Sequence, residues 1–135
     1  MNALSAADAL EWEPLLQTRG HLGVTVCYRK RRKTYALLVT FSRVVVHQLG
    51  FTKRTDVRTA VARGHGLLQI KPAPTSPTRT QAPDINGRVT VSIPLALGDM
   101  PHASEPCAYT ITDGVLTLQL PAWATKVLQE THHGD

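Results

Sequence analysis

The strongest constraint on the fold is a tight turn, Asp113-Gly114, that lies between two runs of alternating apolar and polar residues. These runs are residues 108–112 and 115–120. An Asp-Gly pair favours the left-handed backbone that a two-residue hairpin turn requires, so we expect two antiparallel strands joined there. Pro121 ends the second strand, because proline has no N–H to donate to a β-ladder.

The same period of two recurs along the chain and predicts a mostly β protein. The other expected strands are residues 24–29, 34–41, 57–62, 67–71 and 88–93, of which the first two and the next two form hairpins. Residues 94–106 are expected to be irregular. Residues 72–83 hold four of the nine prolines, which argues against any strand or helix and predicts a linker or a surface strap.

Short helices are expected at three places. Residues 5–18 predict an N-terminal helix capped by Ser5, and residues 43–49 predict an internal helix between a Ser42 cap and a Gly50 stop. After Trp123, which is expected to pack back on the β structure, residues 125–135 predict a frayed helix and tail.

Composition places the chain among ordinary globular proteins. Apolar residues make up 42% and charged residues 19%, which excludes wholesale disorder. The longest uninterrupted apolar run has five residues, 35–39, whereas a membrane span needs about twenty, so no membrane association is expected. The first residues also lack the pattern of a secretory signal. Cys27 and Cys107 show no CxxC spacing, and we expect reduced thiols in a cytoplasmic protein.

Charge is distributed unevenly and gives the first functional indication. Residues 1–74 carry 12 basic and four acidic side chains, net +8, whereas residues 75–135 carry three and six, net −3. Such asymmetry indicates that one half meets a polyanion. A solvated basic surface without a partner is the plain alternative.

The two halves resemble each other in the order strand, connector, strand, tight turn, strand and proline. Val39-Thr40-Phe41-Ser42 aligns with Val91-Ser92-Ile93-Pro94, and Leu68-Gln69-Ile70-Lys71-Pro72 aligns with Leu118-Gln119-Leu120-Pro121. A repeat too small to bury its own apolar face should pack against its twin.

The first copy, with Leu49-Gly50-Phe51 and Asp56-Val57 between those segments, resembles the AbrB/MazE-type swapped-hairpin (SpoVT-AbrB-like) DNA-binding domain. Ser42 stands where that family has proline, and Arg54-Thr55 replace Gly-Asp. In the second copy Pro101 and Pro106 disrupt the helix.

The resemblance implies a small β-barrel of swapped-hairpin type that presents a basic surface to double-stranded DNA. In that family two copies, normally from two chains, make one barrel. This chain is therefore expected to form either a homodimer or an intramolecular pseudo-dimer. The implied organisation is an N-terminal helical segment (1–22), a basic AbrB-like domain (23–72), a Pro-rich linker (73–86), a second degenerate repeat (87–124) and a tail (125–135).

The candidate DNA-binding residues centre on five consecutive cations between the first two strands, namely Arg29, Lys30, Arg31, Arg32 and Lys33. Cations beside a duplex displace condensed counterions, and arginine also pairs with guanine edges. Four further cations are expected to extend this surface: Arg43, Lys53, Arg54 and Arg58.

The sequence offers no pattern for catalysis or for a metal or other cofactor. The six histidines show no HxxxH or HExxH spacing, and neither cysteine has an identifiable catalytic partner. We therefore expect a non-enzymatic DNA-binding protein, such as a bacterial or phage transcriptional regulator. The alternative is a protein-interaction module that binds an acidic protein, either antitoxin-like or a phage accessory or structural protein.

Overall fold

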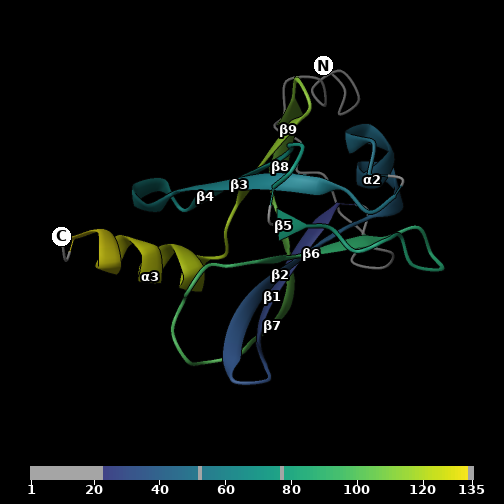
Figure 1. Ribbon diagram of the computed structural model, residues 1–135. Helices are drawn as coiled ribbons and strands as arrows, with labels where there is room; N and C mark the ends of the chain where they lie inside the picture. Colours follow the sequence, from purple (N-terminus) through teal and green to yellow (C-terminus); the bar gives the residue numbers. More distant parts are fainter. Residues whose placement is uncertain (1–22, 52, 77, 134–135) are drawn as a thin grey trace, which may run out of the picture.

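The structure, a computed structural model, describes residues 23–51, 53–76 and 78–133 (Figure 1). The helix predicted over residues 5–18 lies outside the described residues. Within them, the strands form two antiparallel sheets, which confirms a mostly β fold. The described strands do not close into a barrel, and in this respect the fold differs from the expected one.

The first sheet has four strands in the order β6-β2-β1-β7. Their bounds are β1 Val24–Arg31, β2 Thr34–Phe41, β6 Val89–Ile93 and β7 His102–Cys107. The predicted β1–β2 hairpin is confirmed, with eight pairs in continuous register from Val24↔Phe41 to Arg31↔Thr34.

The second sheet has five strands in the order β5-β3-β4-β9-β8. Their bounds are β3 Asp56–Ala62, β4 Leu67–Pro72, β5 Thr78–Arg79, β8 Tyr109–Thr112 and β9 Val115–Gln119. The predicted hairpins β3–β4 and β8–β9 are both confirmed. Asp113 and Gly114 adopt φ of 53° and 78°, which is the left-handed backbone expected of the Asp-Gly turn.

Both sheets contribute to one hydrophobic core, because alternate residues of each strand face inward. The core includes Val26 and Phe41 from the first sheet and Ile70 and Leu116 from the second. The internal helix α2 (Arg43–Leu49) adds Val45 and other residues to it. The Ser42 side chain accepts a hydrogen bond from Val45 N, and Gly50 ends the helix at φ 75°, as predicted.

The C-terminal helix is longer and better packed than the sequence indicated. α3 spans Ala122–His133, so it begins before the predicted tail, and Ala124 and Leu128 are fully buried. Gly66, after the 3-10 turn η1 (Arg63–His65), lies against Thr125 of this helix. The helix predicted within residues 125–135 is therefore confirmed as far as His133, and it begins three residues earlier than expected, at Ala122.

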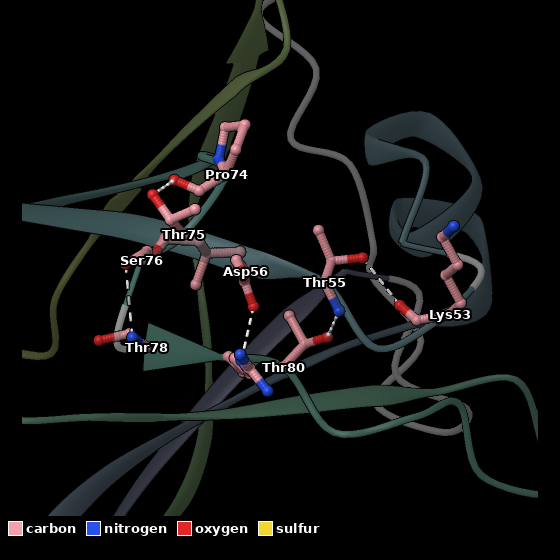
Figure 2. Close-up of polar contacts among 10 residues, drawn as sticks. Lys53, Thr55, Asp56, Pro74, Thr75, Ser76, Thr78 and Thr80 are labelled. Carbon is pink, nitrogen blue, oxygen red and sulfur yellow. Dashed lines mark hydrogen bonds and ion pairs between the residues drawn. The ribbon is translucent and has the colours of Figure 1, made fainter.

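Two segments expected to lack strands contain them. In residues 72–83, β5 pairs with β3, and the Arg79–Asp56 ion pair (2.7 Å) and the hydrogen bond from Thr55 N to Thr80 Oγ1 (3.0 Å) hold it there (Figure 2). In residues 94–106, β7 pairs with β1. Prolines argued against a strand in residues 72–83, but β5 itself contains none. β7 contains Pro106, which an edge strand tolerates because it is paired on one side only.

Candidate nucleic-acid interface

The five-cation run forms the distal end of the β1–β2 hairpin, which we call the basic tip (Arg29, Lys30, Arg31, Arg32 and Lys33). Because β1 extends to Arg31 and Arg31 pairs with Thr34, only Arg32 and Lys33 form the turn. The basic tip is therefore a two-stranded ribbon with a tight end, and in Figure 1 it extends away from α2.

Strand alternation divides the basic tip into two faces. Arg29 and Arg31 share one face, opposite Ala36 and Thr34 of β2. Lys30 lies on the other face, opposite Tyr35. The ribbon thus presents arginines from one side and a lysine beside an aromatic ring from the other.

All five cations of the basic tip are exposed, and none of them forms an ion pair with another described residue. The ion pairs among the described residues are Arg79–Asp56 and Arg88–Asp84. Five adjacent positive charges that pair with none of the described carboxylates repel one another, and a polyanion relieves that repulsion.

The turn of the basic tip contains an unfavourable backbone conformation. Arg32 has φ 58°, in the left-handed region that costs an L-residue with a Cβ about 1–2 kcal/mol. Glycine or asparagine is the usual residue at such a turn position. The two-residue hairpin turn requires this conformation, as it does at Asp113, and here the residue that adopts it carries a positive charge.

The base of the basic tip is held by Tyr28, a fully buried residue of β1. Its hydroxyl donates to Gly98 O (2.8 Å) and accepts from Leu97 N (2.9 Å). Its ring stacks on Tyr35 at a centroid distance of 5.3 Å.

A hollow of about 440 Å³ lies between the basic tip and the loop after β6. Its lining residues are Tyr28, Lys30, Lys33, Thr34, Tyr35, Ala96, Gly98 and Asp99. Sequence reasoning did not associate this loop with the basic run, because the two are about 70 positions apart and no local pattern links them.

The four other predicted cations are exposed but do not join the basic tip. Arg43 begins α2, at the far end of β2, which an eight-residue strand places about 25 Å from the turn. A Cβ at Gly87 would lie 3.1 Å from Arg43 Cγ, so Arg43 lies beside a different turn. Lys53 and Arg54 precede β3, and Figure 2 shows Lys53 beside α2.

Arg58 lies on β3 in the second sheet, directly opposite Lys71 of β4. These two like charges form a separate and smaller positive spot. The structure therefore does not bring the four further cations into the basic tip, because β2 carries the chain away from it.

The described residues contain no group of three or more His, Cys, Asp and Glu side chains that could hold a metal ion. Cys107 is half-buried, and burial together with the nearby charge of Glu105 raises the pKa of its thiol to about 11. None of the helices in the described part of the chain is long and apolar enough to cross a membrane.

Comparison with protein-family models, with curated proteins and with solved structures finds no match for this chain. Its function must therefore be argued from the site itself.

Proposed function

We propose that this protein binds double-stranded DNA through the basic tip, as a cytoplasmic transcriptional regulator of bacterial or phage type. One observation carries the proposal: five exposed cations, none of them paired with an acidic side chain in the part of the chain that the structure describes, lie at the end of a two-stranded ribbon. The resemblance to swapped-hairpin DNA-binding domains points in the same direction, although it extends only to short motifs.

The shape of the basic tip supports duplex DNA as the polyanion. The major groove, about 12 Å wide, admits a two-stranded β-ribbon. Phosphate contacts from Lys30, Arg32 and Lys33 would fix the ribbon in the groove, and Arg29 and Arg31, which share a face, would be placed for base edges. An acidic protein could bind the same cations, but the narrow shape of the ribbon fits a groove better than a flat protein surface.

The proposal is tested by fluorescence anisotropy with a random-sequence duplex at several salt concentrations. On a random-sequence duplex, which offers no specific base edges, Arg29 and Arg31 would also contact phosphates, and five phosphate contacts predict a slope of log affinity against log salt of about −4.5. Removing two contacts with Arg29→Ala and Arg31→Ala should lower its magnitude by about 2. Both side chains are exposed, so the fold should be retained.

The matched control is the double variant Lys53→Ala and Arg54→Ala, which removes the same charge from exposed positions away from the basic tip. This control should leave the slope nearly unchanged. Absence of binding at low salt would overturn the proposal. An equal effect of the two double variants would show that net charge, and not the basic tip, governs binding. A partner captured from nuclease-treated lysate would then support the acidic-protein alternative.

A further inference from the structure

The two copies of the repeat are related in the structure by an approximate two-fold axis. Val39 and Val91, which occupy equivalent positions in the sequence alignment, are direct partners in the antiparallel β2–β6 pair. Leu68 and Leu118, also equivalent, are direct partners in the antiparallel β4–β9 pair. Equivalent residues face each other across an antiparallel pair only where a two-fold axis passes between them.

The second copy also has a counterpart of the β1–β2 hairpin. Val26 pairs with Val39 in the first copy, and Thr80 forms a bridge to Val91 in the second. Gln81 N then donates to Thr90 O at 2.8 Å, which continues the pairing. Residues 80–91 thus form a short second hairpin, and copy two begins within the segment predicted to be a linker.

Within its own residues, the end of this second hairpin carries no unpaired positive charge, and a single exposed cation from outside it, Arg43, lies beside Gly87 of its turn. Its turn is built on Asp84, whose Oδ1 accepts from Asn86 N (2.8 Å) and Arg88 N (2.9 Å). Arg88, the one cation of this hairpin, pairs with the Asp84 carboxylate at 3.2 Å. Hydrogen bonds from Arg88 and Asn86 lower the pKa of Asp84, which keeps the carboxylate charged. Ile85, at the outermost position, is 99% exposed.

We infer that the chain is a covalent pseudo-dimer that binds one duplex segment from one side, through the basic tip alone. The inference rests on the proposed function and specifies its DNA target. A symmetric dimer presents two equivalent hairpins and selects palindromic sites. In this chain the second copy occupies, in both sheets, the surface that a second chain would use, and its hairpin end has one neighbouring cation, Arg43, where the first hairpin has five. The target is therefore a single, non-palindromic contact site, bound by one chain.

The first test is the stoichiometry of the complex, measured by native mass spectrometry with a 14-base-pair duplex, a length of about 1.4 helical turns. The expected species are a free monomer and a complex of one chain with one duplex. A free dimer, or two chains held together on one duplex, would overturn the inference and leave DNA binding intact. Absence of any complex would overturn the proposed function, and the inference with it.

The second test locates the DNA relative to each hairpin. Both native cysteines are first replaced, by Cys27→Ser and Cys107→Ser. Thr34→Cys then places a single thiol beside the turn of the first hairpin, and Ile85→Cys, in a separate variant, places one in the turn of the second hairpin. An iron chelate attached there cleaves nearby DNA. We expect cleavage from position 34 and only background from position 85. Equal cleavage from both positions would overturn the inference. The native-mass measurement uses the unmodified chain, so it decides the stoichiometry even if these variants fold poorly.

Discussion

At the residue scale, Arg32 is expected to lower the stability of the fold but to strengthen DNA binding. Its φ of 58° suits glycine, so Arg32→Gly removes a steric cost and should raise the free energy of unfolding by up to about 1 kcal/mol. The same change removes one charge from the basic tip and should weaken DNA binding. Urea unfolding and anisotropy measure the two effects.

Arg31→Gly is the matched control, because Arg31 lies in the extended β1 strand and carries the same charge. It should lower stability by about 0.5–1 kcal/mol and also weaken binding. If both glycine variants changed stability in the same direction, the left-handed conformation of Arg32 would not be a source of strain.

Also at the residue scale, Cys107 should be an unreactive thiol at neutral pH. Burial, aided by the charge of Glu105, raises its pKa to about 11, and only the thiolate is alkylated. In a Cys27→Ser variant the alkylation rate should therefore climb with pH until about pH 11. The urea-unfolded chain should instead level off near the ordinary value of 9.0. A native plateau near pH 9 would contradict the effect of burial.

At the element scale, two glycines with similar backbones should differ in their tolerance of alanine. Gly66 and Gly114 have φ of 63° and 78°, so alanine at either position costs about 1–2 kcal/mol. No atom lies within 4 Å of a Cβ at Gly114, whereas a Cβ at Gly66 would lie 2.7 Å from Thr125 Cγ2. Gly66→Ala should therefore lower the melting temperature more than Gly114→Ala. Equal losses would show that α3 does not pack closely against η1.

Local chemistry explains which elements could be predicted from the sequence. The Ser42 cap, the Gly50 stop and the Asp113-Gly114 turn act within a few residues, and all three lie where they were expected. β5 and β7 could not be predicted, because their short, polar sequences are held by partners far along the chain. β7, for example, pairs with β1 about 80 positions earlier.

The same distinction applies to the candidate site. The five cations of the basic tip are adjacent in sequence, so their clustering required only one hairpin. The hollow beside Lys30 depends on the bonds of the Tyr28 hydroxyl to the loop after β6, which no periodicity encodes. The separation of Arg43 from the basic tip depends on the length and direction of β2, and therefore on tertiary structure.

At the scale of the whole molecule, the two copies should unfold together. β2 of the first copy pairs with β6 of the second, and β4 pairs with β9, so neither copy completes a sheet alone. Both copies also fill the same core, in which Ile70 and Leu116 are fully buried. Separating the copies would expose these residues and the unpaired edges of two central strands, which makes an intermediate with one folded copy unfavourable.

Urea unfolding measures this cooperativity. In a Trp12→Phe variant, fluorescence reports Trp123, which stacks on His102 of β7 with centroids 3.7 Å apart, while far-UV circular dichroism reports all strands. The two transitions should coincide, with one midpoint and one slope. A fragment of residues 1–72 should remain unfolded, because β2 lacks β6 and β4 lacks β9. Distinct midpoints, or a folded fragment, would show that the copies are independent domains and that the interleaved sheets do not make the chain one cooperative unit.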